Sequence, residues 1–329
     1  MARARIVRRR RRRYTGPVRV ALLLLCACAA VAPPAPAQAV IRLELVDTAV
    51  FRARRVVESS GVTPSARRPG VLWTHNDSGD DARLYATDSA GDDLGSVLVA
   101  GARNVDWEDL AAGPCSGGVG RCFYVADIGD NWRRRDHVEV YRLREPEPPL
   151  GAADTMRTVP LEAAFRFRYP DHPHDAEAIV VDRTAGVMLI TKEVLGRPRV
   201  YLAPEKQGPQ GPGQVDTLRF VGLLDVEPSL ARLRVVTGAA VSPDGSTLAV
   251  RTYTSLHFFR LRGDSLPAPL TPGAGLTIPF VEPQGEGVAF IAPDLLALTS
   301  EKGDAARGTM ARIRVFGLSR PTPGAPPRL

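Results

Sequence analysis

The sequence is poor in the residues and motifs that build many familiar catalytic sites. It holds four cysteines and five histidines among 329 residues. It has no His-Glu-x-x-His pattern, no phosphate-binding loop of the Walker type and no Gly-x-Ser-x-Gly turn. These absences argue against a zinc metalloprotease, a P-loop enzyme and an α/β-hydrolase.

The sequence also lacks an apolar run long enough to span a membrane, which needs about 20 residues. Its one marked run, residues 20–32, follows nine arginines with no acid among them and precedes PPAPAQA. A basic head, a short apolar run and an Ala-x-Ala site predict a signal peptide over residues 1–39. We therefore expect an exported protein, periplasmic or secreted, with no membrane span after cleavage. A lipid anchor at Cys28 is less favoured, because a cysteine occupies the middle position of the Leu-Cys-Ala stretch before it.

Excess charge is absent once this leader is set aside. The remaining chain has 34 basic and 36 acidic residues, so the positive net charge belongs to the leader. The rest of the chain has no excess of positive charge that would bind a polyanion, and we expect no nucleic-acid partner.

Two cysteines remain outside the leader, Cys115 and Cys122, at the ends of CSGGVGRC. In an oxidising compartment this glycine-rich loop predicts a disulfide, with a pair of free thiols as the alternative.

No long amphipathic helix pattern follows residue 39, and short β-branched runs separated by turns dominate. Five apolar runs share a small or acidic residue near the start: SSGVTP, WEDLAA, AEAIVV, TGAAVS and GEGVAF. Each is followed by a turn and a second strand that ends in polar residues, and third and fourth strands often follow. The second residues of the five runs are Ser60, Glu108, Glu177, Gly238 and Glu286.

A period of about 50 residues with four strands per unit is typical of a β-propeller. We predict an all-β fold of five four-stranded blades in a single domain, residues 40–318. The alternative is a six-bladed propeller, with a sixth, degenerate blade within residues 127–175. The segment VIRLELVDTAVFRARRVV should supply the outer strand of the last blade and close the ring. Residues 319–329 read as a disordered proline-rich tail.

A propeller would bring the polar strand ends together at one face. The innermost strands line the channel, so Glu108, Glu177 and Glu286 should converge there. The second strands end at the same face, where they carry His75, Asn76, Asp77, Asp127, Asp130, Asn131, Lys192, Glu193, Arg251, Tyr253 and Glu301.

This oxygen-rich rim suits Ca²⁺, which takes six to eight oxygen ligands. The expected metal ligands are Asn76, Asp77, Glu108, Asp127, Asn131 and Glu286, with Asp106 as a further candidate. Zinc fits less well, because His75 is the one histidine at the rim and His172 and His174 are interpreted as parts of a solvated loop. In the alternative, Lys192 and Arg251 neutralise the acids in a structural ion-pair network.

Several stretches together carry a family resemblance: WTHNDSG, DWEDLA, DIGDN, DAEAIVVD, SPDG followed by VRTY, and QGEGVAF. Over about residues 55–318 they resemble a group of exported bacterial β-propeller proteins, most of them uncharacterised. Related propellers include phytase-like and esterase-like proteins and calcium-dependent lactonases. The resemblance to the lactonases implies one calcium ion held from separate blades, here by Glu108, Asp127 and Glu177. Lys192 and Arg251 depart from that pattern and would suit an anionic substrate.

Two functions follow from this interpretation. The first is a calcium-dependent hydrolase of phosphoesters, carboxylic esters or lactones. In it His75, Asp130 or Glu177 activates water, and Lys192, Arg251 and Tyr253 hold a small anionic or ester substrate. The second is a non-catalytic propeller that binds a ligand or a protein at the same rim.

Overall fold

The computed structural model describes residues 40–149, 157–204, 211, 213–227, 234–262 and 265–318. All of them belong to one compact unit, which spans residues 39–329. The predicted signal peptide (1–39) and the predicted tail (319–329) lie outside the described residues. Within the described ranges, the regular structure is strand apart from a single 3-10 turn at Ser116–Gly118. No helix in those ranges is both long and apolar enough to cross a membrane.

The strands form five sheets, and each sheet is one blade. Blade 1 contains β2 (Ser59–Pro64), β3 (Val71–Asn76), β4 (Arg83–Asp88) and β5 (Asp93–Ala100). Blade 2 contains β6 (Trp107–Pro114), β7 (Arg121–Asp127), β8 (Val138–Arg144) and β10 (Ala163–Arg168). Blade 3 contains β11 (Ala176–Val181), β12 (Val187–Thr191), β13 (Arg199–Leu202) and β15 (Arg219–Leu223). Blade 4 contains β16 (Val236–Val241), β17 (Thr247–Thr252), β18 (Ser255–Arg260), β19 (Ala268–Pro269) and β20 (Leu276–Thr277). Blade 5 contains β21 (Gln284–Ala292), β22 (Leu295–Glu301) and β23 (Thr309–Phe316).

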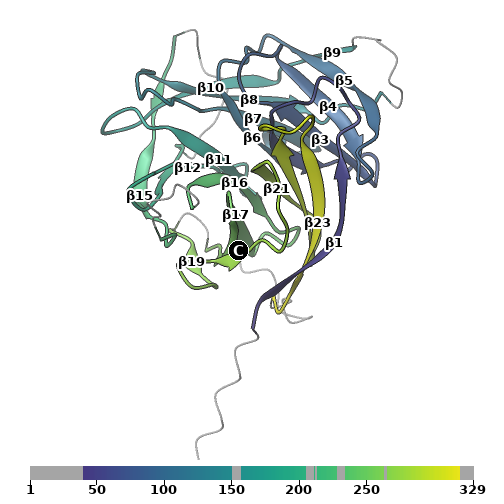
Figure 1. Cartoon of the computed structure of the whole chain (residues 1–329). Coiled ribbons are helices and arrows are strands. Elements are labelled where there is room, and N and C mark those ends of the chain that lie inside the picture. The colour runs from purple at the N-terminus through teal and green to yellow at the C-terminus, as the bar shows by residue number, and fades with distance from the viewer. Residues whose placement is uncertain are drawn as a thin grey trace, which may run out of the picture. The chain divides into compact units, whose positions relative to one another are not determined.

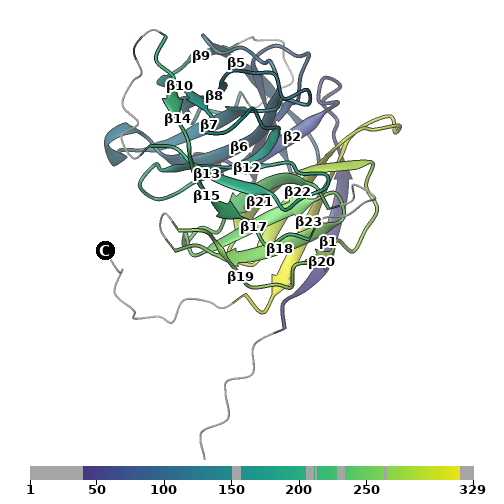
Figure 2. The same cartoon turned by 90° about the vertical axis from the view of Figure 1, so that its left-hand side faces the viewer.

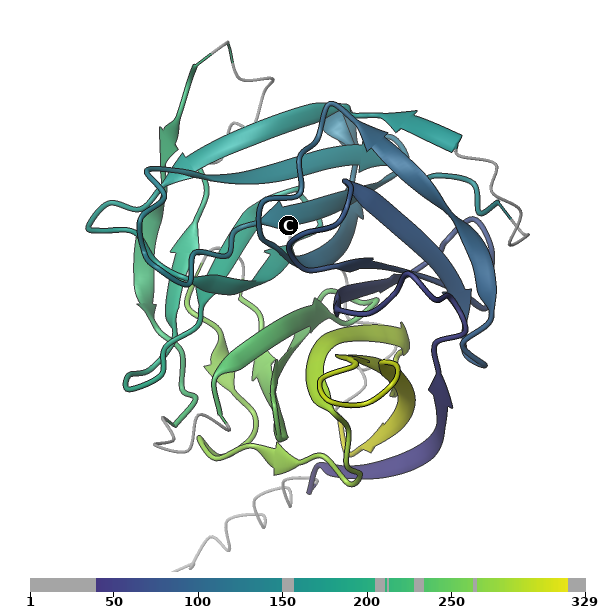
Figure 3. The same cartoon turned by 45° about the horizontal axis from the view of Figure 1, so that its top comes forward.

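The predicted five-bladed propeller is confirmed, and so is its closure. The innermost strands β2, β6, β11, β16 and β21 contact one another in ring order, with β21 next to β2 again. Figures 1 and 3 show the sheets side by side around a common centre. The N-terminal strand β1 (Arg42–Val50) runs antiparallel to β23 and completes blade 5. No sixth blade exists in the described part of residues 127–175, whose strands all belong to blades 1 and 2.

Two short strands join the blade before their own, which the sequence pattern did not predict. β9 (Arg157–Pro160) follows the third strand of blade 2 but pairs in parallel with β5 of blade 1. β14 (Asp216–Thr217) follows the third strand of blade 3 but pairs in parallel with β10 of blade 2. Figure 2 shows both at the outer edges of their sheets. Each exchanged strand covers an edge that would otherwise expose unpaired backbone groups.

The hydrophobic core is divided among the junctions between blades. Five clusters of buried side chains lie between blades 1 and 2, 2 and 3, 3 and 4, 4 and 5, and 5 and 1. Trp73 and Trp107 are fully buried in the first of these junctions, whereas Trp132 is exposed. Because each sheet buries both faces against its neighbours, the ring provides a rigid support for the residues at its centre.

The predicted disulfide is also confirmed. Cys115 and Cys122 are bonded at the ends of the turn that joins β6 to β7. Both are buried at the junction between blades 2 and 3.

Candidate functional site

A β-bulge near the start of every innermost strand positions the central residues. In blade 2 the paired residues are Trp107 with Asp127 and then Asp109 with Ala126, so Glu108 is left as the extra residue. In blade 3 the pairing skips Glu177 in the same way. The three other innermost strands shift register at the corresponding place. A bulge turns the extra residue out of the normal alternation and re-aims its side chain.

Five carboxyl groups from blades 1, 2 and 3 meet beside these bulges. Asp77, Asp106 and Glu108 each offer an oxygen within 4.8 Å of the others. Glu108, Asp175 and Glu177 form a second triad under the same limit. Because Glu108 belongs to both triads, the five residues form one continuous group, which we call the carboxyl cluster.

The carboxyl cluster holds protons that isolated carboxyls would lose at neutral pH. Burial, followed by the charges of Glu177, Asp77 and Asp106, raises the pKa of Glu108 well above its usual range. Burial raises the pKa of Glu177 to about 7, although Lys192 opposes the shift.

Asp77 and Asp106, which offer oxygens within 4.8 Å of each other, have pKa values shifted in the same direction. Burial is the main cause of a pKa of about 6 for Asp77 and about 7 for Asp106. Buried carboxyls this close together repel one another when they are ionised, so the cluster favours protons that a cation could replace.

Lys192 places one positive charge against the cluster. Its Nζ forms an ion pair with Glu177 Oε1. Burial disfavours the ammonium form, yet the charges of Glu177 and Glu108 keep the pKa of Lys192 above its usual value. One ammonium group cannot neutralise five carboxylates, so the pKa values of the carboxyl cluster stay raised despite Lys192.

Blade 5 contributes two further acids near Glu177. Burial and then the charge of Glu177 raise the pKa of Glu286 well above its usual range. Burial, Glu58 and Glu177 raise the pKa of Glu301 to about 7. Glu286 Oε1 accepts a hydrogen bond from Gln284, while Oε2 is buried with no hydrogen-bond partner among the described residues. An unpaired buried carboxylate oxygen is a ready ligand for a cation.

Gly129 leaves the space that Glu108 and Asp106 occupy. A Cβ at this position would lie 2.2 Å from Glu108 Oε1 and 2.5 Å from Asp106 Oδ2. The close approach of these two acids therefore depends on the missing side chain of residue 129.

We expect Gly129→Ala to lower the free energy of unfolding by about 1–3 kcal/mol, the usual cost of overpacking. The new methyl group would push Glu108 and Asp106 apart, so calcium affinity should fall as well. Urea unfolding and calcium titration measure the two effects. Gly196→Ala is the matched control, because a Cβ there meets its nearest atom at 4.0 Å. Equal stability and equal affinity for both variants would contradict the assigned role.

Asn76 and Asp127 are not free to ligate, although the sequence predicted both as metal ligands. Asn76 Oδ1 accepts hydrogen bonds from the backbone N–H groups of Val57 and Glu58, each at 3.0 Å. Asp127 is fully buried and pairs with Arg135 at 2.7 Å. Backbone and guanidinium donors occupy these side chains, so we leave both out of the candidate ligand set.

Asp130 and Asn131 also lie outside the carboxyl cluster. Asp130 Oδ2 accepts the backbone N–H of Arg135 at 2.8 Å, and its own N–H donates to Asp175 Oδ1 at 2.9 Å. Asp130 therefore organises the loop after β7 and holds Asp175 in place. Asn131 is exposed on that loop.

Arg251 has a structural position rather than the predicted ligand-binding one. It is fully buried, and its Nη1 donates to the carbonyls of Gly287 (2.6 Å) and Thr299 (2.8 Å) in blade 5. Its Nη2 pairs with Glu282. These contacts join blade 4 to blade 5, and the paired acid, Glu282, is not one of the rim acids that the ion-pair alternative named.

His75 is buried between blades 1 and 2, which argues against its predicted catalytic role. Its ring packs edge-on against Trp107 at 5.5 Å between centroids. Burial lowers its pKa to about 4, so the imidazole is neutral at physiological pH. Tyr253 is partly buried, and burial followed by the charge of Glu286 raises its pKa.

The sequence interpretation overlooked Asp109 and Asp175. Asp109 Oδ2 accepts the backbone N–H groups of Ile179 (3.0 Å) and Ala239 (3.3 Å), so it links the innermost strands of blades 2, 3 and 4. Burial raises its pKa to about 7. Asp109 directly follows Glu108 in WED and Asp175 lies two residues before Glu177 in DAE, and this proximity in the sequence was the available signal.

Comparison with known proteins identifies no family for this chain. No family model matches the chain, and no curated protein does. Among solved structures, the PQQ-bound aldose sugar dehydrogenase of Streptomyces coelicolor is 14% identical, with a TM-score of 0.45. That alignment covers 84% of this chain and 99% of the dehydrogenase. The Cps50 (Swd1) β-propeller domain of Myceliophteria thermophila is 12% identical, with a TM-score of 0.37, over 82% of this chain and 99% of that domain. Similarity at this level carries no argument about a substrate or cofactor.

Proposed function

We propose that the carboxyl cluster binds a divalent, oxygen-preferring cation, with calcium as the first candidate. The observation that carries the proposal is the joining of two carboxyl triads through Glu108 in a buried setting. The raised pKa values of Glu108, Glu177 and Asp106 support it, because a divalent cation replaces protons that the cluster must otherwise hold. The ligand set contains oxygen alone, which favours calcium over zinc.

We further propose that the protein is an exported hydrolase of phosphoesters, carboxylic esters or lactones. A bound cation would polarise a phosphoryl or carbonyl oxygen of the substrate. Glu177 has a pKa of about 7, which suits a group that accepts a proton from water at neutral pH. Lys192, next to Glu177, is placed to hold the anionic part of a small substrate.

The test combines metal content, thermal unfolding and activity. We expect about one equivalent of calcium in the purified protein, and a lower melting temperature after chelation. Glu177→Gln should lower calcium affinity at least tenfold and hydrolysis of phosphoester or lactone substrates by about 10²–10⁴-fold. Glu139→Gln is the control, because Glu139 pairs with Arg166 at 2.7 Å in the outer part of blade 2.

The outcomes separate the two predicted functions. Calcium binding without turnover of any of these esters would leave a non-catalytic propeller that binds a ligand at the rim. Neither bound calcium nor a melting shift would overturn the cation site and the hydrolase together.

A further inference from the structure

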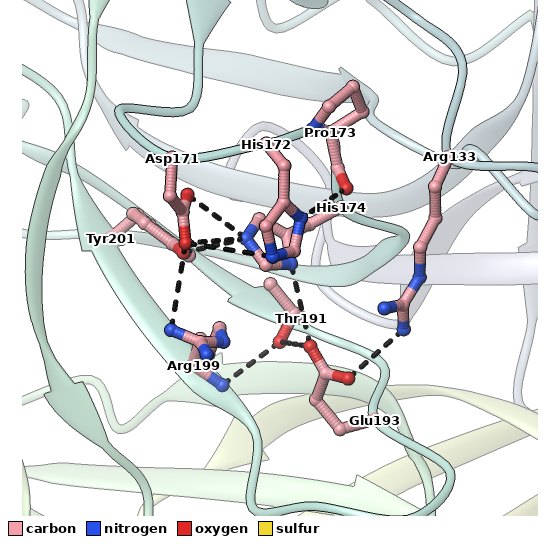
Figure 4. A network of polar contacts seen from close by, with 9 residues as sticks. All are labelled: Arg133, Asp171, His172, Pro173, His174, Thr191, Glu193, Arg199 and Tyr201. Carbon is pink, nitrogen blue, oxygen red and sulfur yellow. Dashed lines mark hydrogen bonds and ion pairs between the residues drawn. The ribbon is translucent and has the colours of Figure 1, made fainter.

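A second group of possible metal ligands lies in the loop between β10 and β11, outside the carboxyl cluster. Asp171, His172 and His174 each offer a ligand atom within 4.8 Å of the others. Figure 4 shows the carboxylate and the two imidazole rings facing one another. The sequence pattern PDHPH was interpreted as a solvated loop. However, His174 is fully buried and its ring centroid lies 4.2 Å from that of His172.

The spacing of these atoms suits a small four-coordinate ion. Ligands about 2.0–2.1 Å from a tetrahedral zinc ion are separated from each other by roughly 3.3 Å. His174 Nε2 lies 3.1 and 3.2 Å from the two oxygens of Asp171. His172 Nε2 lies 4.0 Å from Asp171 Oδ2. A modest rotation of the exposed His172 side chain would bring all three groups to the required separation.

The other ring nitrogen of each histidine faces an oxygen of the kind that supports a metal-bound imidazole, and Nδ1 of His174 makes no hydrogen bond among the described residues. His172 Nδ1 lies 3.1 Å from the carbonyl oxygen of Pro173, which favours a proton on Nδ1 and a free lone pair on Nε2. His174 Nδ1 lies 3.5 Å from Glu193 Oε1. Metal-binding histidines typically donate their second N–H to a carbonyl or carboxylate in this way.

These supporting groups are themselves held in place. Glu193 accepts hydrogen bonds from Arg133 at 3.0 Å and from Thr191 at 3.2 Å. The Tyr201 hydroxyl lies 3.1 and 3.2 Å from the oxygens of Asp171, and it is 2.8 Å from His174 Nε2. Figure 4 shows Glu193 and Tyr201 around the three candidate ligands, with the Tyr201 hydroxyl as close to Asp171 and His174 as a further ligand would be. A pre-positioned outer shell is expected of a metal site and is not needed by a solvated loop.

We propose that Asp171, His172 and His174 bind a transition-metal ion, with zinc as the expected occupant. Two imidazoles and one carboxylate favour zinc over calcium, which prefers oxygen ligands alone. His172 is more than half exposed, so the fourth position is open to water. This site is independent of the proposed calcium site and would exist even if that proposal failed.

Cobalt(II) and zinc are the probes, and the protein is prepared without a polyhistidine tag. We expect one equivalent of Co²⁺ to give visible d–d absorption bands, and zinc but not calcium to abolish them. His172→Ala should weaken zinc binding at least tenfold in calorimetric titration. Glu193→Gln should weaken it about 10–100-fold through the second shell.

Two controls keep the result interpretable. His137→Ala removes a histidine whose Nδ1 is 3.0 Å from Asp136, and it should leave zinc affinity unchanged. Glu177→Gln alters the carboxyl cluster and should likewise leave it unchanged. Because His172 is exposed, its variant should melt like the wild type in chelator. Unchanged zinc affinity in folded His172→Ala, or no cobalt bands in the wild type, would overturn the proposal.

Discussion

Replacing Arg251 by leucine should lower the free energy of unfolding by about 3–5 kcal/mol, the usual cost of breaking a buried ion pair by removing one partner. The substitution leaves the carbonyls of Gly287 and Thr299 without their donor, and it leaves the charge of Glu282 buried without a partner. Urea unfolding at pH 7 measures the effect. Arg260→Leu at the exposed end of β18 is the control and should cost less than about 0.5 kcal/mol.

A double substitution tests whether Glu282 is the relevant partner. Arg251→Leu combined with Glu282→Gln should cost less than the sum of the two single changes, because no unpaired charge remains. If Arg251 were instead a ligand-binding residue, its removal would leave stability nearly unchanged and weaken binding of an anionic ligand. That result would restore the role predicted from the sequence.

In the presence of chelator, the protein should be more stable at pH 6 than at pH 8. Glu177 and Asp106 have a pKa of about 7 when folded, above their ordinary values near 4, so the folded state binds more protons in this range. Their favourable contribution is complete below the ordinary pKa and is lost as the pH rises through about 7. The combined effect of the two carboxyls is at most about 3 kcal/mol, with Asp106 contributing less because it is less deeply buried than Glu177.

The buried histidines oppose the carboxyl effect at the lower end of this pH range. Burial lowers the pKa of His75 and of His257 to about 4, so each favours unfolding as the pH falls below its ordinary value near 6.5. Thermal unfolding of the wild type and of Glu177→Gln at pH 6, 7 and 8 isolates the carboxyl effect, because the histidines contribute equally to both proteins. Glu177→Gln should flatten the pH dependence, and added calcium should raise the melting temperature more at pH 8 than at pH 6. A stability that rises from pH 6 to pH 8 in chelator would contradict this account of the cluster.

Much of the fold was predictable because blade strands are local features of the sequence. Each innermost strand is a short apolar run bounded by turn residues, and all five were found at the expected places. The pairing of β1 with β23 was predictable because a ring needs closure. The exchanged strands β9 and β14 were not, because strands of four and two residues carry no recognisable period. The sheet that each of these strands joins depends on which neighbouring blade has an unpaired outer edge within reach.

The candidate site was predictable in outline for the same reason. Glu108, Glu177 and Glu286 recur at one position of a repeated strand, so a ring must bring them towards one another. The bulges that aim their side chains follow from pairing with the second strand, and a single strand does not reveal them. Asp175 was overlooked because it lies just outside β11, where no strand alternation marks it.

The sequence by itself determined the propeller class and the five innermost strands, and it predicted the disulfide, because local alternation, turn residues and the two remaining cysteines are local signals. Only the tertiary structure decided which polar residues are available for chemistry. In the sequence, Asn76, Asp127 and Arg251 are polar residues near the ends of predicted strands. The same is true of Asp77, Glu108 and Lys192, so the pattern does not separate the two sets. The hydrogen-bonding groups of the first three are taken up by Val57, Arg135 and Gly287 respectively. Such partners come from other strands, loops or blades, and the position of one residue in its own strand does not specify them.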